Sequence, residues 1–99
     1  MSDLDPVVHQ PARLRIMGAL CGLAAAEQVD FGYLKSKLKL TDGNLGAHLT
    51  TLEESGYIEV EKTFVGKKPK TFVAVTKAGR RAFDGHVAAL RLIMAAAKD

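Results

Sequence analysis

The sequence has few of the residues from which many functional sites are built, and it has no long hydrophobic run. Only one of its 99 residues is a cysteine, Cys21, which excludes an internal disulfide and a metal site made of cysteines. The apolar neighbours of Cys21 favour a buried thiol in a reducing compartment. The longest apolar stretches, residues 19–26 and 92–97, are too short to span a bilayer, and no secretory leader is recognisable. We therefore expect a cytosolic protein with no contact to membranes.

Catalytic and cofactor motifs are also missing. The sequence contains no Walker-type glycine loop and no paired His-Glu signature. Cys21 and the three histidines, His9, His48 and His86, form no recognisable catalytic or metal-ligating pattern. These absences predict a protein that is not an enzyme and that has no cofactor or metal site. Metal sensing through His9, His86 and a nearby carboxylate is the alternative that these residues leave open.

The positive charge is concentrated in the middle of the chain. The length allows one small domain, residues 1–99, and the content of 47% hydrophobic and 25% charged residues is ordinary for a globular protein. The net charge is +3 at pH 7. Residues 35–82 carry ten basic and five acidic side chains, whereas residues 1–34 carry two basic and four acidic ones. This clustering, more than the modest total, indicates an anionic partner.

Two helices are predicted in the first part of the chain. Leu14 and Met17 follow two early prolines at helical spacing and predict a well-buried first helix. Asp30 can cap a short second helix, with Val29 adding a brief strand before it. A turn of three or four residues then leads to a third helix over residues 42–55, which is the spacing of a helix-turn-helix.

The third helix has glycines at 43 and 46, in its opening turns, although each costs about 1 kcal/mol relative to alanine. If Leu45 faces the core, Gly43 and Ala47 point away from it, so the outward surface is almost bare. A bare helix start with free amides suits a close anionic partner such as the DNA major groove. A frayed helix start or a tight helix crossing would also explain the glycines. The candidate DNA contacts are Thr41, Asp42, Gly43, Asn44, Ala47, His48 and Thr51, of which Asn44 and Thr51 are best placed for bases and His48 for a base or the backbone.

A β-hairpin with a basic tip is predicted next. Ile58, Val60 and Phe64 alternate with polar residues, residues 71–75 form a second apolar strand, and residues 65–70 form the turn between them. An isolated lysine cluster is usually a solvated loop, but the order of helix, turn, helix and hairpin favours DNA binding. The lysines expected at phosphates or in the minor groove are Lys67, Lys68 and Lys70, and those expected to clamp the DNA backbone are Lys35, Lys37 and Lys39.

The last predicted helix, residues 77–97, can be capped by Thr76. Its apolar residues fall into two adjacent stripes, one through Phe83 and Leu90 and the other through Ile93. This is more apolar surface than one small core needs, so we expect the helix to pack on a partner as well.

Three segments carry a resemblance to a known family: "HQPARLRIMGAL" (9–20), "LTDGNLGAHLTTLEESGYIEVEK" (40–62) and "GKKPKTFVAVTKAGRRAF" (66–83). In this order they resemble the winged-helix transcriptional regulators of the MarR/ArsR-like group. The family pattern is "TDGNLSRHL", whereas here Gly46 and Ala47 replace the usual serine and arginine.

The resemblance implies an α+β, mainly α fold: a winged helix-turn-helix with a two-stranded β-hairpin wing and an added C-terminal dimerisation helix. Residues 42–55 would be the recognition helix and 64–71 the wing, and the first and last helices would build a homodimer. The implied dimer residues are Leu14, Met17, Phe83, Val87, Leu90, Ile93 and Met94. The implied function is transcriptional regulation, with the dimer bound to double-stranded DNA at a pseudo-palindromic operator. A winged helix that binds proteins instead of DNA is the alternative, favoured by the missing arginine and the modest net charge.

Overall fold

Within the described residues, 4–24 and 27–97, the chain forms five helices and a three-stranded antiparallel sheet, as the computed structural model shows. The elements are α1 (Pro6–His9), α2 (Pro11–Cys21), β1 (Val29–Asp30), α3 (Phe31–Leu38), α4 (Asp42–Glu54), β2 (Ile58–Val65), β3 (Lys68–Val75) and α5 (Lys77–Ala97). The strand order is β1-β3-β2. The predicted winged-helix architecture with an added C-terminal helix is therefore confirmed, and the brief strand at Val29 extends the predicted two-stranded hairpin to a three-stranded sheet.

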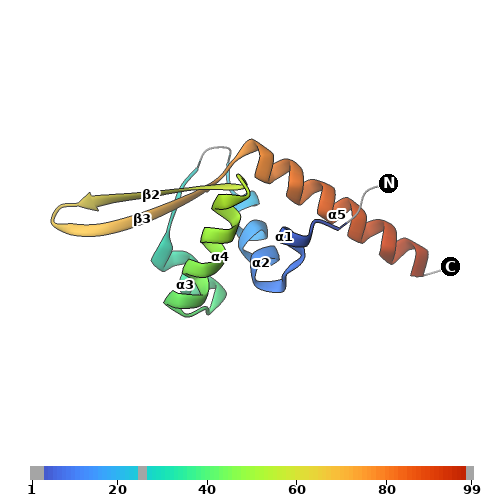
Figure 1. The fold of residues 1–99 in the computed structure, drawn as a ribbon, viewed down its shortest axis with the longest axis horizontal. Coiled ribbons are helices and arrows are strands. Elements are labelled where there is room, and N and C mark those ends of the chain that lie inside the picture. The colour runs from blue at the N-terminus through green and yellow to red at the C-terminus, as the bar shows by residue number, and fades with distance from the viewer. Residues whose placement is uncertain (1–3, 25–26, 98–99) are drawn as a thin grey trace.

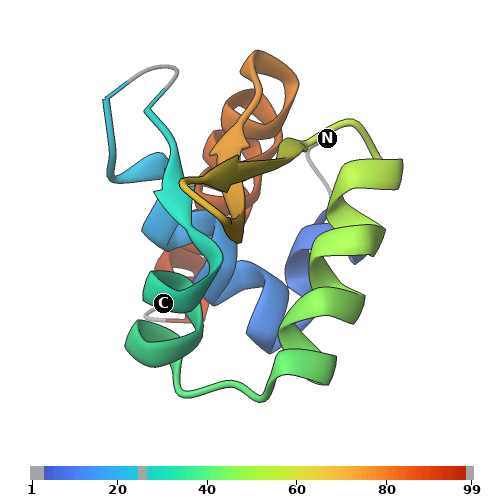
Figure 2. The ribbon, with the colours of Figure 1, turned by 90° about the vertical axis from the view of Figure 1, so that its left-hand side faces the viewer.

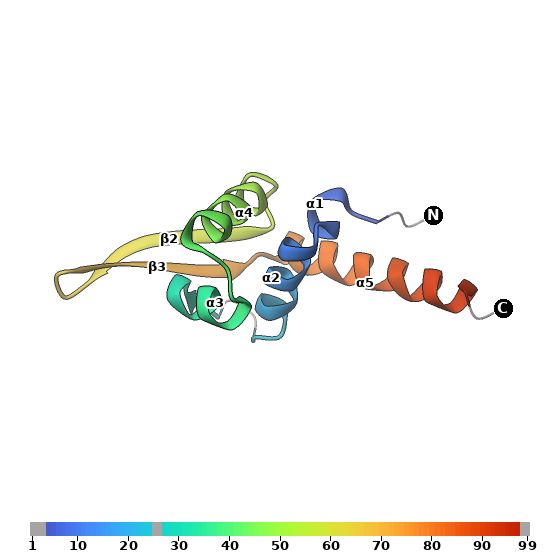
Figure 3. The ribbon, with the colours of Figure 1, turned by 90° about the horizontal axis from the view of Figure 1, so that it is seen from below.

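The molecule is elongated, with extents of 58 × 25 × 22 Å. The β2–β3 hairpin projects from one end and α5 from the other (Figure 1). Seen along the hairpin, α3 and α4 lie on its two sides, with α3 in contact with β3 and α4 with β2 (Figures 2 and 3). The helix-turn-helix and the hairpin thus share one end of the molecule.

The core lies between the helices and the base of the sheet. In the antiparallel register Ile58 is opposite Val75 and Val60 is opposite Val73, so their side chains leave the sheet on the same face. The buried apolar residues are Val8, Ile16, Met17, Leu20, Leu34, Leu38, Leu45, Leu49, Leu52, Ile58, Val73 and Val75. Met17 was predicted at a dimer interface, and this assignment is wrong, because its side chain is fully buried in the core of its own protomer.

Local side-chain chemistry sets the helix boundaries. Thr41 Oγ1 accepts a hydrogen bond from the Asn44 backbone N–H at 3.1 Å, and Gly56 ends the segment after α4 with φ +80°. The predicted single first helix is instead two helices that meet at Gln10. Because Gln10 precedes Pro11, its backbone is forced out of the helical region, with φ −60° and ψ 129°.

The turn between α3 and α4 contains an unusual backbone conformation. Lys39 follows α3 with φ 55° and ψ 47°, the left-handed region, and its N–H donates to the Lys35 carbonyl. Arg15 of α2 donates from Nη2 to the Leu38 carbonyl at 2.7 Å, which ties the end of α3 to the core. Together these bonds fix the direction in which α4 starts.

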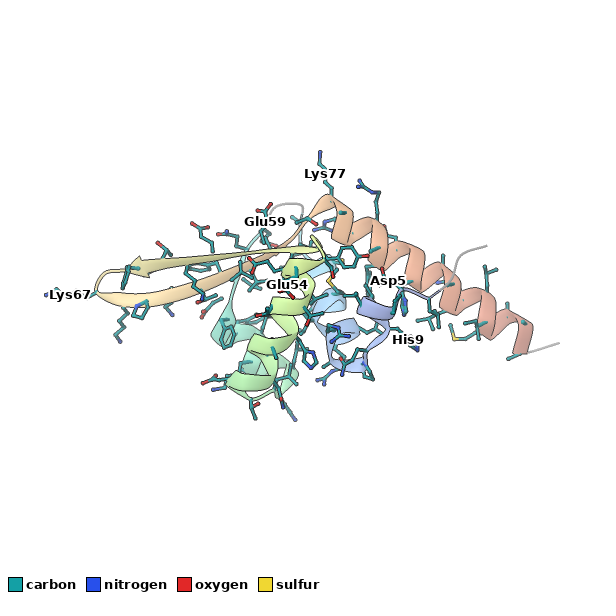
Figure 4. All side chains as sticks on the ribbon, in the orientation of Figure 1. Asp5, His9, Glu54, Glu59, Lys67 and Lys77 are labelled. Carbon is teal, nitrogen blue, oxygen red and sulfur yellow. The ribbon has the colours of Figure 1, made fainter. Side chains whose placement is uncertain are left out.

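The segment before α1 is bonded to α5 by buried polar groups, near Asp5 and His9 in Figure 4. His86 of α5 is only 1% exposed, and its Nδ1 accepts from the Asp5 backbone N–H at 3.2 Å. Its Nε2 lies 3.5 Å from His9 Nδ1. The Tyr57 hydroxyl donates to Asp5 Oδ2 at 2.6 Å. Because Nδ1 of His86 must accept, this network requires the neutral imidazole.

This network makes the stability of the fold depend on pH. Burial, and then the neighbouring His9, lower the pKa of His86 below its ordinary value of 6.5, and the Asp5 carboxylate opposes this only in part. A histidine whose pKa is lowered by folding takes up its proton more readily in the unfolded chain. We therefore expect the contribution of His86 to the free energy of unfolding, measured with urea, to be complete above pH 6.5 and to decrease as the pH falls below 6.5. His86→Asn keeps an acceptor near the Nδ1 position but cannot be protonated, so it should flatten this dependence; an unchanged slope would contradict the assignment.

Candidate nucleic-acid interface

Packing within the protomer does not explain the glycines on the outward face of α4. A Cβ built on Gly43 or Gly46 would meet nothing within 4 Å beyond the local helix, and Gly43 and Ala47 are exposed. A tight helix crossing within the protomer is therefore excluded as their explanation. A frayed start also does not fit, since α4 is regular from Asp42 and is capped by Thr41.

The polar candidates on α4 have different surroundings. Asn44 is exposed in the first turn. Thr51 is half-buried, and its hydroxyl donates to the Ala47 carbonyl of the same helix at 3.3 Å. Of these two, Asn44 is the more accessible side chain.

His48 is held by a contact that links α4 to α2. Its Nδ1 lies 3.3 Å from Nη1 of Arg13, whose Nε donates to the Val7 carbonyl at 2.6 Å. Arginine only donates, so His48 Nδ1 accepts and the neutral ring carries its proton on Nε2. Burial, and then the Arg13 charge, lower the pKa of His48, which favours this neutral form. Arg13 was missed in the sequence because it lies 35 residues away.

A cleft of about 400 Å³ separates α4 from the hairpin. It is lined by Phe31, Gly46, Leu49, Thr50, Glu53, Val60, Lys62 and Thr71. Gly46 and Thr50 come from the same outward side of α4 as Gly43 and Ala47. The bare helix surface and the hairpin therefore border one cleft on one side of the molecule.

The hairpin is positively charged along its outer part. Residues 62–70 contain four lysines and no acidic residue. Lys67 and Lys68 are exposed at the turn, where Lys67 marks the far end of the molecule (Figure 4). Lys70 is less available, because its Nζ lies 3.7 Å from Asp30 Oδ2.

The lysines of the helix-turn-helix are partly engaged. Lys35 Nζ forms an ion pair with Asp42 Oδ1 at 2.8 Å, so Asp42 at the start of α4 is partly neutralised. Lys37 Nζ lies 5.7 Å from the centre of the Tyr33 ring. Lys39 is exposed in the turn. These three lysines therefore lie on α3 and in the turn that leads to α4, and Lys35 is the one that is paired with a carboxylate.

A helix-turn-helix followed by a hairpin that shares a cleft with its second helix is the arrangement of a winged helix. The winged helix DNA-binding domain family matches residues 12–94. The chain belongs to this family. The resemblance to winged-helix regulators that the sequence suggested is thereby confirmed.

Relatives of this winged-helix chain include the uncharacterized protein MJ0432 of Methanocaldococcus jannaschii. It is 41% identical over 81 residues, which cover 82% of this chain and 85% of the relative. A solved structure of a transcriptional regulator homologue from Pyrococcus horikoshii OT3 is 27% identical with a TM-score of 0.81, and the match covers 91% of this chain and 86% of that one. TA0346 of Thermoplasma acidophilum shares the fold at 21% identity, with a TM-score of 0.71 and coverage of 96% and 94%.

The predicted dimer residues of this winged-helix protein, on α2 and α5, differ in their burial. Leu14, Phe83, Val87 and Leu90 are partly buried in the protomer. Beyond them α5 leaves the body of the molecule (Figure 1), and there Ile93 and Met94 are 53% and 57% exposed. This exposed apolar end of α5 lies at the opposite end of the molecule from the hairpin (Figure 1).

The alternative of metal sensing through His9, His86 and a nearby carboxylate finds little support in the structure. His9 and His86 are adjacent, but the Asp5 carboxylate beside them is taken up by Tyr57 and by the backbone N–H groups of Val7 and Val8. Among the described residues, no group of three or more His, Cys, Asp or Glu side chains is arranged to hold a metal ion. No helix in residues 4–24 or 27–97 is long and apolar enough to cross a membrane.

Proposed function

We propose that this winged-helix protein is a transcriptional regulator that binds double-stranded DNA in a sequence-specific manner. In this proposal α4 enters the major groove, and the hairpin contacts the backbone or the adjacent minor groove. The observation that carries the proposal is the bare face of α4 beside a cleft whose other wall is the lysine-bearing hairpin. A close-fitting surface next to fixed positive charge suits a groove lined by phosphates.

Each part of the site has a different role in this proposal. The exposed Asn44 and the Nε2–H of His48 would contact base edges, and Thr51 would help to position them. Lys67 and Lys68 would hold phosphates, and the lysines near the helix-turn-helix turn would clamp the backbone. Because Gly46 and Ala47 stand where serine and arginine are usual in the family, the hairpin lysines would supply a larger share of the affinity.

The proposal includes a homodimer. The exposed end of α5, with Ile93 and Met94, is an apolar helix surface that a second copy of the chain could cover. Two copies related by a two-fold axis would present two α4 helices to a pseudo-palindromic operator, about one helical turn, roughly 34–36 Å, apart.

Titration of random duplex DNA at two salt concentrations tests the proposal. We expect binding at low salt that weakens steeply at high salt, with two protomers per duplex by analytical ultracentrifugation. Absence of binding even at low salt would favour the protein-interaction alternative. Selection of bound genomic fragments would then identify the operator.

The glycine face offers a sharper test. Gly43→Ala should raise the free energy of unfolding by up to about 1 kcal/mol, because alanine is the better helix former and the added methyl group meets nothing. It should nevertheless weaken DNA binding, and Gly43→Leu should weaken it further, because each side chain holds the backbone away from the groove. Urea unfolding and duplex titration would measure the two effects.

Gly85 provides the matched control for this series. It lies within α5, it is exposed, and a Cβ there also meets nothing within 4 Å. Gly85→Ala and Gly85→Leu should stabilise the helix in the same way and leave DNA affinity unchanged. Equal DNA binding by the Gly43 and Gly85 variants would show that α4 does not approach the duplex closely.

A further inference from the structure

The hairpin carries a phenylalanine that the fold does not use. Phe64 alternates with polar residues in the same pattern as Ile58 and Val60, but its side chain is 72% exposed, whereas that of Ile58 is buried. The hairpin extends past the helices (Figure 1). Phe64 is one residue before the end of β2, close to the turn, whereas Ile58 is at the start of β2, at the base of the sheet. Among the described residues no other large apolar side chain is as exposed.

Phe64 has a rigid apolar partner across the hairpin. Pro69 is directly opposite it in the register, so the two side chains lie on the same face. This is also the face of Val60 and Lys62, which line the cleft beside α4. Proline fixes its own backbone angle and has no N–H to donate, so Pro69 stiffens the hairpin here and disfavours the addition of another strand.

The positive charge of the hairpin limits which partners could cover Phe64 and Pro69. Lys62 lies on the same face as the pair, and Lys67 lies at the turn beside it. Lys68 and Lys70 are opposite Val65 and Thr63 and so belong to the other face of the same hairpin, and residues 62–70 contain no carboxylate side chain. A second hairpin of the same chain would be repelled by like charge. A polyanion with an apolar interior between its rows of charge matches both features, and a DNA duplex, with stacked bases between two phosphate backbones, is such a partner.

We infer that Phe64, backed by Pro69, is a wedge that enters the minor groove, inserts between neighbouring base pairs and bends the duplex. The inference rests on the proposed function. Apolar side chains that enter the minor groove, phenylalanine among them, partially unstack a base step and kink the duplex by about 20–90°. Lys62, on the same face, and Lys67, at the turn, hold the flanking phosphates while the ring occupies the step.

Energy transfer between dyes at the two ends of a duplex measures the bend. The wild-type complex should bring the ends closer together than in free DNA. Phe64→Ala should remove most of this change and lower the affinity about three- to tenfold, with an unaltered salt dependence because no charge is removed. Phe64→Leu should keep part of the bend, since leucine is also an effective wedge.

Val65 supplies the matched control. It is 56% exposed on the next position of β2 and therefore on the opposite face of the hairpin. Val65→Ala removes a similarly exposed apolar side chain and should leave both bend and affinity unchanged.

The outcomes separate the wedge from DNA binding itself. A tight wild-type complex with a straight duplex, or a Phe64→Ala complex that is still bent, would overturn the wedge and leave the proposed function standing. No duplex binding at low salt would overturn both. Binding to phosphatidylserine vesicles that disappears in Phe64→Ala, with duplex binding unchanged, would assign the pair to a membrane surface and also overturn the wedge.

Discussion

Gly79→Ala is expected to lower the free energy of unfolding by about 3 kcal/mol, a large part of the stability of a small domain. Gly79 lies in the first turn of α5, which packs here against Tyr57, in the segment between α4 and β2. A Cβ at this position would overlap the backbone carbonyl of Tyr57 and lie 2.8 Å from Val75 Cγ2. Neither atom belongs to a flexible side-chain end, so the clash cannot be relieved by a change of rotamer.

The surrounding hydrogen bonds prevent the backbone from moving aside. The Tyr57 carbonyl accepts from the Thr76 N–H at 3.0 Å, and Thr76 Oγ1 both donates to the Gly56 carbonyl at 2.7 Å and accepts from the Gly79 N–H at 3.0 Å. Relief of the clash would break part of this set. Urea unfolding followed by circular dichroism would measure the destabilisation, which corresponds to a decrease in Tm of roughly 10–25 °C. The Gly85→Ala variant is the control, and an equally stable Gly79→Ala variant would show that the contact is not as close as described.

Simultaneous replacement of Lys67, Lys68 and Lys70 with alanine is expected to weaken binding to every duplex by roughly tenfold or more at 0.1 M salt. The slope of log affinity against log salt should become shallower by about 0.9 for each phosphate that the hairpin no longer neutralises. Lys67 and Lys68 should account for most of the change, because Lys70 lies close to Asp30. Duplex titration over a range of salt concentrations measures both quantities.

A control variant separates the position of these charges from their number. Lys77, Arg81 and Arg91 are exposed on α5, outside the hairpin and α4, and their replacement with alanine also removes three positive charges. We expect this variant to keep most of the affinity and salt dependence. Equal decreases in affinity for the two triple variants would mean that net charge, not the hairpin, attracts the duplex. Asn44→Ala should behave differently from both, relaxing sequence preference at one position of the operator.

Features that depend on neighbouring residues could be predicted from the sequence. The cap at Thr41, the left-handed stop at Gly56 and the long helix over residues 77–97 all follow from short-range chemistry, and the structure contains them. The bare face of α4 was likewise predictable, because helical periodicity alone places Gly43 and Ala47 opposite the leucine stripe.

Features that depend on distant residues could not be predicted in this way. The contact of Arg13 with His48 and the bond of Tyr57 with Asp5 join residues 35 and 52 positions apart. Periodicity also shows which residues share a face but not what covers that face. Met17 was therefore assigned to a partner although its own protomer buries it, and the pattern that Phe64 shares with Ile58 and Val60 did not reveal that its side chain is exposed.

The left-handed conformation of Lys39 has a consequence for the balance between stability and charge. A residue with a side chain is destabilised by roughly 1–2 kcal/mol in this region relative to its favoured conformation, whereas glycine adopts it freely. The protein thus tolerates conformational strain at the junction between α3 and α4, which sets the direction of α4. In return it places at this junction a positively charged side chain that glycine would not provide. A substitution chosen only to make the fold more robust would begin at this junction and would remove that cation.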